Sequence, residues 1–173
     1  MVVLKSTKFS LRLFNHKNVD MIVCRGEKAI FKANFVRGRK LSLLLCGGCN
    51  GVVCYNLIWG SCNEKYFLEF VVEKLFNHLH EYPQNQSILL LDNCCFHHSQ
   101  IFKEMINQIG AIAIYISPYS PWLNMVEYMF NAIKSIEKTK QITGDEGAYL
   151  SVVDSVESIG QSWLHILQQI GYV

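Results

Sequence analysis

Two short apolar runs on either side of one amphipathic segment constrain the fold of this chain more than any other feature of its sequence. Residues 87–92 form a continuous apolar run that ends in Asp92, and residues 111–116 form a second one. Between them Ser99 can cap a helix that ends at Gly110. Continuous apolar runs of this length are typical of strands buried on both faces of a sheet. The pattern predicts a strand–helix–strand crossover with parallel strands.

The segment before this crossover has the pattern of antiparallel strands followed by a helix. An Asn50-Gly51 pair between two apolar runs is a strong hairpin signal. Residues 63–80 then change to helical spacing, with Phe67 and Leu75 among the apolar residues on one side. The expected strands of this part are residues 2–4, 29–36, 41–46 and 52–59.

Two further helices complete the expected order of elements. One runs from about residue 124 to about residue 136, and residues 150–170 form a last amphipathic helix with Val153 on its apolar stripe. A hairpin followed by strand–helix–strand crossovers gives a mixed sheet with helices on its faces. We therefore expect an α/β fold, a ribonuclease-H-like mixed β-sheet flanked by α-helices, in a single domain of residues 1–173.

The positive charge of the chain is concentrated near its start. Residues 1–40 hold ten Lys and Arg against two acidic residues, a net charge of +8, whereas residues 41–173 have a net charge of −6. A basic segment beside an acidic body suits a polyanionic partner on one face, and a solvated charged surface is the alternative. Arg37, Arg39 and Lys40 are the candidate nucleic-acid-binding residues.

The sequence gives no sign of a membrane or secretory protein. No apolar run approaches the roughly 20 residues that a membrane span needs. Residues 1–23 mix four basic residues into short apolar stretches and make a poor signal peptide. We expect an intracellular protein without a membrane span, located in the nucleus if the source is eukaryotic.

Seven cysteines raise the alternatives of a metal site or of disulfides. Without a secretory signal, reduced thiols are the default. Cys46 and Cys49 have zinc-knuckle spacing, and Cys94 and Cys95 precede two histidines, but adjacent cysteines are awkward ligands for one tetrahedral ion. Buried small side chains are the favoured interpretation. A zinc-stabilised module built around Cys46 and Cys49 stays open as an alternative.

Asp92 and Glu127 are the candidate catalytic residues. Asp92 ends a predicted strand, where open α/β sheets place functional groups, and Glu127 lies in the helix that follows the neighbouring strand. Carboxylates suit Mg²⁺ or Mn²⁺, and two such ions can promote in-line displacement at phosphorus. Each acid also has a structural explanation. Asp92-Asn93 could end a strand in a turn, and Glu127 has capping-box spacing from Asn124.

The residues around the two acids carry a family resemblance. Residues 90–99 read Leu-Leu-Asp-Asn-Cys-Cys-Phe-His-His-Ser, and residues 118–127 read Pro-Tyr-Ser-Pro-Trp-Leu-Asn-Met-Val-Glu. The two acids have 34 residues between them. These blocks and their separation resemble the second and third catalytic blocks of mariner-type DDE transposases. The resemblance extends over residues 5–138, most of the chain.

The resemblance implies metal-dependent cleavage and strand transfer of DNA, as in transposition and integration. Mg²⁺ or Mn²⁺ would be the cofactor and DNA the partner, with a homodimer as an open option. The residues that the resemblance assigns to the site are Asp92 and Glu127 as second and third metal ligands, Asn93, His97 and His98 as supporting residues, and Asn124 as the cap of the helix that orients Glu127.

The first aspartate of the family has no counterpart here. Aligning Phe9 and the basic stretch 25–29 to the family pattern puts Lys5 where that aspartate is expected. An ammonium group cannot ligate a metal ion and would repel it or pair with Asp92. Family members usually carry an upstream helix-turn-helix region that this sequence lacks, so we expect a truncated or degenerate copy, or one put to another use. A non-catalytic nucleic-acid-binding or interaction domain that retains the fold is the alternative function.

Overall fold

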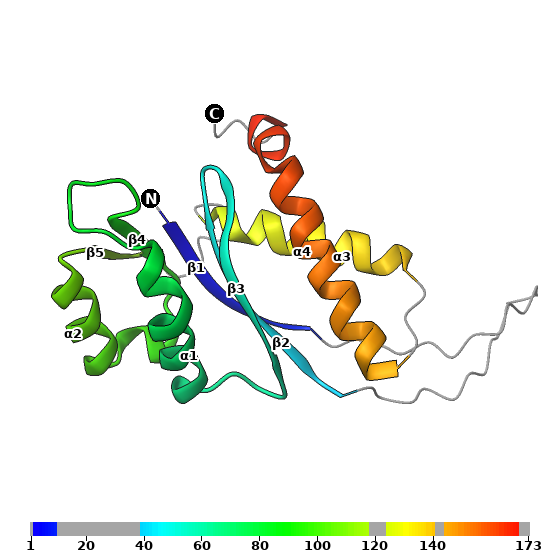
Figure 1. The fold of residues 1–173 in the computed structure, drawn as a ribbon, viewed down its shortest axis with the longest axis horizontal. Coiled ribbons are helices and arrows are strands. Elements are labelled where there is room, and N and C mark those ends of the chain that lie inside the picture. The colour runs from blue at the N-terminus through cyan, green and yellow to red at the C-terminus, as the bar shows by residue number, and fades with distance from the viewer. Residues whose placement is uncertain (1, 10–38, 118–123, 141–143, 170–173) are drawn as a thin grey trace, which may run out of the picture.

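A five-stranded mixed sheet forms the centre of the fold in the computed structural model (Figure 1). The structure describes residues 2–9, 39–117, 124–140 and 144–169. The strands are β1 (Val2–Phe9), β2 (Leu41–Gly48), β3 (Gly51–Trp59), β4 (Ile88–Leu91) and β5 (Ile112–Tyr115). Their order in the sheet is β3-β2-β1-β4-β5. The β3–β2 and β2–β1 pairs are antiparallel, whereas the β1–β4 and β4–β5 pairs are parallel. The predicted hairpin and crossover are both confirmed.

Helices cover both faces of this sheet. They are α1 (Glu64–Phe70), α2 (Gln100–Ile109), α3 (Met125–Thr139) and α4 (Gly144–Gln169). α1 continues as a π-helical turn, Val71–Leu75, and a 3-10 turn, Phe76–His78, so the single helix expected over residues 63–80 has three parts. None of the helices that the structure describes is both long enough and apolar enough to cross a membrane.

Local capping signals set where α1 and α2 begin and end. The Oδ1 atom of Asn63 accepts a hydrogen bond from the Tyr66 N–H at 2.9 Å, and Ser99 Oγ accepts one from the Phe102 N–H at 3.3 Å. Each bond satisfies one of the backbone donors that a helix N-terminus leaves free. Gly110 ends α2 in the left-handed conformation, with φ of 76°, as its position after the helix predicts.

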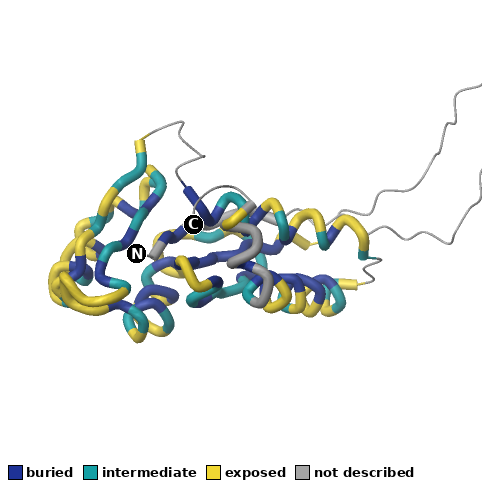
Figure 2. Tube along the Cα trace, turned by 90° about the horizontal axis from the view of Figure 1, so that it is seen from above, coloured by how far each residue is buried: buried dark blue, intermediate teal, exposed yellow. Residues whose placement is uncertain are grey.

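Each face of the sheet has its own hydrophobic core. On one face α1, the π-helical turn and α2 pack on buried strand residues such as Leu4 and Leu89. On the other face α3 and α4 pack on residues such as Val3 and Leu43. β2 is buried along its whole length because alternate residues enter opposite cores. Figure 2 shows the buried segments concentrated in these strands, with exposed residues on the outer surfaces of the helices.

A buried polar cluster joins α3 to α4. Glu137, which is 9% exposed, accepts hydrogen bonds from Ser151 Oγ at 2.9 Å and from Ser155 Oγ at 2.6 Å. Lys140 Nζ lies 3.7 Å from the Glu137 carboxylate and donates to the Ser151 carbonyl oxygen at 3.0 Å. Farther along α4, the Trp163 indole donates to the Gly48 carbonyl oxygen at 2.9 Å. These bonds fix α4 against both α3 and the sheet.

Several local predictions require correction. β5 is not a strand buried on both faces, because it lies at the sheet edge and leaves Ile112 and Ile114 39% and 44% exposed. α4 begins earlier than residue 150, and Val152 enters the core completely while Val153 is only half-buried. β1 extends well beyond the expected residues 2–4. The strand expected at residues 29–36 lies outside the described residues.

Candidate active site at the carboxyl end of the sheet

Asp92 directly follows β4, where the sequence places it. In the parallel β1–β4 ladder Leu4 pairs with Leu91. Lys5 is the next residue along β1, which continues to Phe9, and Asp92 is the next residue after β4, so the two occupy neighbouring backbone positions where the β1–β4 pairing ends. Parallel strands align their carboxyl ends at one edge of a sheet, and this edge is where α/β folds place ligands.

Glu127 lies in the first turn of α3, which packs on the sheet beside this edge. Asn124 caps the helix, accepting the Val126 N–H at 3.1 Å through Oδ1, and its carbonyl oxygen accepts the Glu127 N–H at 3.0 Å. Asn124 is 3% exposed, whereas Glu127 is half-buried. The predicted cap is confirmed. The side-chain bond of Asn124 goes to Val126, the second residue of the helix.

Gly47 allows the first turn of α3 to lie close to the sheet. A Cβ atom on Gly47 would lie 2.7 Å from both the Sδ and Cε atoms of Met129 and 3.3 Å from Val126 Cγ2. Gly47 pairs with Val3, and Val3 pairs with Leu90, two residues before Asp92. The turn that carries Glu127 therefore lies over the strands that lead to Asp92.

His97 contacts Asp92 from within the core. It is completely buried, with its ring 4.9 Å from Phe67 and 5.0 Å from Phe96, centroid to centroid. Its Nδ1 atom lies 3.0 Å from the Asp92 carbonyl oxygen and 2.8 Å from Asp92 Oδ1. The carbonyl is the better aligned acceptor, so we assign the ring proton to Nδ1. His97 thus lies in contact with Asp92, and its supporting role in the site stays a prediction.

The oxygen atoms of the Asp92 carboxylate are of the kind that binds a hard divalent cation. Oδ1 is shielded from solvent and has no well-aligned hydrogen bond among the described residues, while the side chain as a whole stays 29% exposed. A carboxylate with an unsatisfied oxygen and an open side suits Mg²⁺ or Mn²⁺. However, the described residues contain no group of three or more His, Cys, Asp or Glu placed to hold a metal ion. A metal-ligand role for Asp92 and Glu127 therefore stays a prediction.

Tyr115 is a site residue that the sequence analysis missed. Its hydroxyl donates to the His97 carbonyl oxygen at 2.7 Å, and its ring stacks on His98 with a centroid distance of 4.4 Å and an interplanar angle of 17°. His98 Nε2 in turn contacts the side-chain oxygen of Asn93. An aromatic residue with a polar tip at the end of the strand next to Asp92 is the signal that could have identified it.

The two cysteine pairs that the sequence singles out, Cys46 with Cys49 and Cys94 with Cys95, belong to no group of metal-ligating side chains among the described residues. Cys46 is completely buried and pairs across the hairpin with Cys54, whereas Cys49 is exposed at the turn. Burial raises the pKa of the Cys94 thiol; the backbone hydrogen bond from Phe96 opposes this, and the charge of Asp92 adds to it. No three-residue metal group occurs among the described residues, so the zinc-module alternative is not supported there.

Two of the three candidate nucleic-acid-binding residues fall within the described part of the chain. Arg39 is exposed, lies 3.8 Å from Asp145 and sits over the Trp59 ring at 5.3 Å. Lys40 is also exposed, and its Nζ donates to Ser61 Oγ at 3.1 Å. Arg37 lies outside the described residues. Leu41, which follows Lys40, pairs with Phe9, four positions past Lys5. Arg39 and Lys40 therefore lie about 15 Å along β1 from the end of the β1–β4 pairing, where Asp92 lies.

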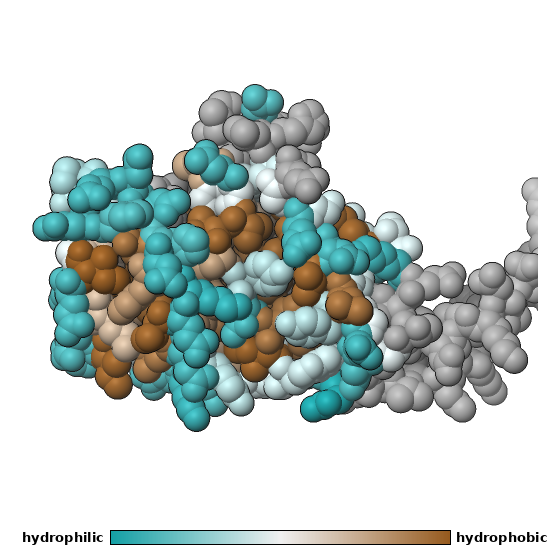
Figure 3. All heavy atoms as spheres, in the orientation of Figure 1, coloured by the Kyte–Doolittle hydropathy of each residue, from teal (hydrophilic) through white to brown (hydrophobic). Residues whose placement is uncertain are grey.

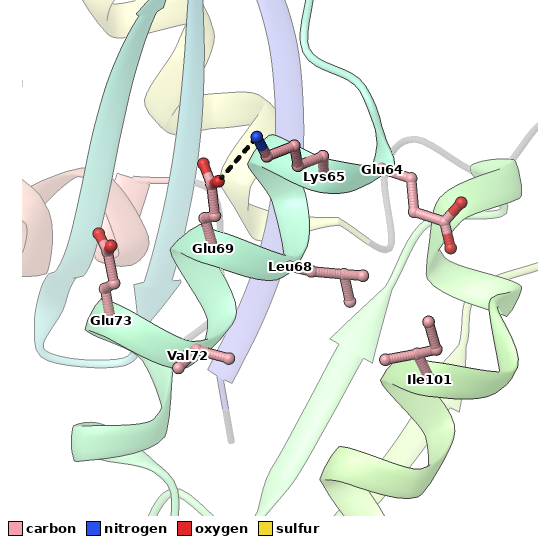
Figure 4. Close-up of a pocket in the computed structure, with 7 residues that line it drawn as sticks. All are labelled: Glu64, Lys65, Leu68, Glu69, Val72, Glu73 and Ile101. Atoms are coloured by element: carbon pink, nitrogen blue, oxygen red, sulfur yellow. Dashed lines mark ion pairs between the residues drawn. The ribbon is translucent and has the colours of Figure 1, made fainter.

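Two surface hollows lie away from the carboxylates. One, of about 520 Å³, runs between α2 and the helix formed by α1 and its π-helical turn (Figure 4). Val72 and Ile101 are exposed there and Leu68 is half-buried, with glutamate side chains beside them. The other, of about 810 Å³, lies beside the edge strand β3, between α4 and the π-helical and 3-10 turns that follow α1 (Figure 3). Neither includes Asp92 or Glu127 in its lining. The candidate site is therefore separate from both hollows.

Comparison with known proteins places the chain in a family and a fold. A family model described as DDE superfamily endonuclease matches residues 21–146. No curated protein matches the sequence. Among solved structures, a pre-cleavage Mos1 transpososome and a Mos1 mariner paired-end complex with Mn each match with a TM-score of 0.64 and 17% identity, over 98% of this chain and 55% of the other. The catalytic domain of Mos1 mariner transposase matches with a TM-score of 0.58 and 14% identity, over 98% and 81%.

These matches confirm the predicted ribonuclease-H-like fold. The chain spans about half the length of the full transposase chains that it matches. The boundaries of the single domain, residues 1–173, and the roles assigned to the site residues stay predictions.

Proposed function

This chain belongs to the DDE superfamily endonuclease family, and we propose that its ancestral reaction is metal-dependent cleavage and strand transfer of DNA, weakened here by Lys5 in place of the first acidic ligand. The observation that supports the proposal is the register of β1 and β4, which pairs Leu4 with Leu91, the residues directly before Lys5 and Asp92. The two mariner paired-end complexes solved with Mn and Mg support the choice of metal and the DNA partner.

Two residues of the proposed site would bind the metal ion, and two others orient those ligands. Asp92 and Glu127 would hold a Mg²⁺ or Mn²⁺ ion, which when bound stabilises charge at the reacting phosphate. His97 orients Asp92 through Nδ1, and Asn124 fixes the helical turn that carries Glu127. Lys5 stands at the sequence position where the family has a ligand, and its positive charge would oppose cation binding there.

The test is nicking of supercoiled plasmid DNA by the purified chain in Mg²⁺ or Mn²⁺. Replacing Lys5 with Asp should raise the nicking rate at least about tenfold, because a metal site contributes several kcal/mol and each 1.4 kcal/mol is tenfold in rate. Lys5→Ala is the matched control, since it removes the ammonium without adding a ligand. The gain should vanish when Asp92→Ala is added. Equal nicking by the Lys5→Asp chain with and without Asp92 would refute the catalytic proposal.

A non-catalytic DNA-binding function is the second candidate, favoured by the net charge of +8 in residues 1–40 and by the exposed Arg39 and Lys40. Their distance of about 15 Å from the Asp92 edge corresponds to four or five base pairs, so one duplex could contact both. DNA affinity should then fall steeply with salt, and Lys40→Ala should reduce the slope of log affinity against log salt by about 1. Affinity that is independent of salt would count against this function. A homodimer and a nuclear location stay predictions.

A further inference from the structure

Tyr115 contacts both histidines of the turn that follows Asp92. It is the last residue of β5 and pairs with Leu91, the last residue of β4. The Ile116 N–H extends this pairing by donating to the Leu91 carbonyl oxygen at 2.8 Å. The backbone of Tyr115 is thus held by the sheet beside the end of β4, and its side chain projects from a fixed position.

The two contacts of Tyr115 reach the two histidines in different ways. Its hydroxyl donates to the His97 carbonyl oxygen at 2.7 Å, and its ring lies nearly parallel to the His98 ring at 4.4 Å. Burial raises the pKa of the Tyr115 phenol, so the hydroxyl remains protonated and stays a donor at neutral pH. The hydroxyl and the ring therefore hold adjacent residues of one short turn.

Each histidine then holds one of the two residues that follow β4. His97 Nδ1 contacts the carbonyl oxygen and Oδ1 of Asp92, and His98 Nε2 contacts the Asn93 side chain. The turn itself, Cys95–His98, is a single 3-10 turn without a side-chain cap. Such a turn has few internal bonds of its own, so its position depends on neighbours. Tyr115 is the described residue that joins both histidines to β5.

We infer that Tyr115 is a positioning residue, which braces the Cys95–His98 turn from β5 and thereby sets the orientation of the Asp92 carboxylate. This inference rests on the proposed function of Asp92 as a metal ligand. Residues that orient a ligand through a hydrogen bond commonly change metal affinity ten- to a hundredfold when they are replaced. A tyrosine that only filled the end of the core would change stability and leave the affinity of the folded protein unaltered.

Tyr115→Phe tests the hydroxyl alone, because the ring and its stacking on His98 are retained. Two quantities are measured on the folded chain, namely the Mn²⁺ dissociation constant by calorimetry and the NMR signal of the His97 Nδ1 proton without metal. We expect Mn²⁺ binding to weaken about ten- to a hundredfold and the proton signal to shift or to exchange faster. Tyr66→Phe is the matched control, because Tyr66 is 40% exposed on α1, and it should change neither quantity.

The outcomes separate this inference from the proposed function. If Tyr115→Phe leaves the Mn²⁺ affinity and the His97 signal as they are in the folded chain, the positioning role is overturned. A shifted His97 signal with unaltered Mn²⁺ affinity also overturns it, because the brace is then not transmitted to the ligand. If the wild-type chain binds no more Mn²⁺ than Asp92→Ala does, the proposed metal function fails. In that case a shifted His97 signal still supports Tyr115 as the brace of the turn, and an unshifted signal overturns it.

Discussion

Gly47→Ala should loosen the contact between α3 and the sheet. The new Cβ atom would lie 2.7 Å from the Sδ and Cε atoms of Met129, whereas carbon contacts are most favourable at about 3.5–4.0 Å. Met129 is completely buried, so its thioether has to move by roughly 1 Å into an occupied core or the first turn of α3 has to rise. Overpacking of this kind costs about 1–3 kcal/mol. In a chain of this length each kcal/mol lowers the melting temperature by about 2–4 °C.

Thermal and urea unfolding of a double-mutant cycle test this reasoning. Met129→Ala alone should destabilise by about 2–5 kcal/mol because it leaves a cavity. Combined with Gly47→Ala it should cost at least about 1 kcal/mol less than the two changes added, because the new methyl group enters that cavity. Gly160→Ala is the control. It makes the same chemical change inside α4 with no atom within 4 Å of the new methyl group, and it should stabilise by about 0.5–1 kcal/mol. If the losses of unfolding free energy caused by Gly47→Ala and Met129→Ala are additive in the double variant, the contact between the two residues is refuted.

Two further predictions concern the buried polar cluster and the buried thiol. Ser155→Ala should lower the free energy of unfolding in urea by about 1–3 kcal/mol, because Glu137 Oε1 loses its 2.6 Å donor. The exposed Ser61→Ala serves as control, and an equal effect of both would count against the cluster. Stability should also decline above about pH 8.5, where unfolded thiols ionise, because burial first, and then Cys54, raise the pKa of Cys46 in the folded chain. The contribution is full below that pH and is lost at up to about 1.4 kcal/mol per pH unit as the pH rises towards the folded pKa, so Cys46→Ala should flatten the decline.

Features that depend on neighbouring residues in the sequence were predictable. Ser99, Gly110 and Asn124 act as helix caps where they were expected, because capping bonds join residues two or three apart. The apolar run before Asp92 forms β4 for a similar reason, since a run of this length needs burial. The position of Asp92 at the carboxyl end of an inner strand followed from the order of elements alone.

Features that depend on distant contacts were not predictable in the same way. Tyr115 reaches His97 and His98 only because β5 pairs with β4, and no pattern around Tyr115 specifies those partners. The apolar run that became β5 resembled β4, yet it lies at the edge, because nothing in a single run reports how many strands lie beyond it. Val152 rather than Val153 enters the core since the contact between α4 and α3 sets the rotation of the helix.

The pairing of β1 with β4 also determines when this site can form during folding. Val2 pairs with Leu89, so the hairpin of β2 and β3 and the helix α1 are synthesised before β1 can acquire its second neighbour. Closing so long a loop carries an entropic cost, and parallel pairings between distant segments form slowly. Until β4 emerges, one edge of the future central strand remains open to other chains. The neighbourhood of Lys5 and Asp92 is therefore a late product of folding, and the nascent chain is most prone to aggregation just before it forms.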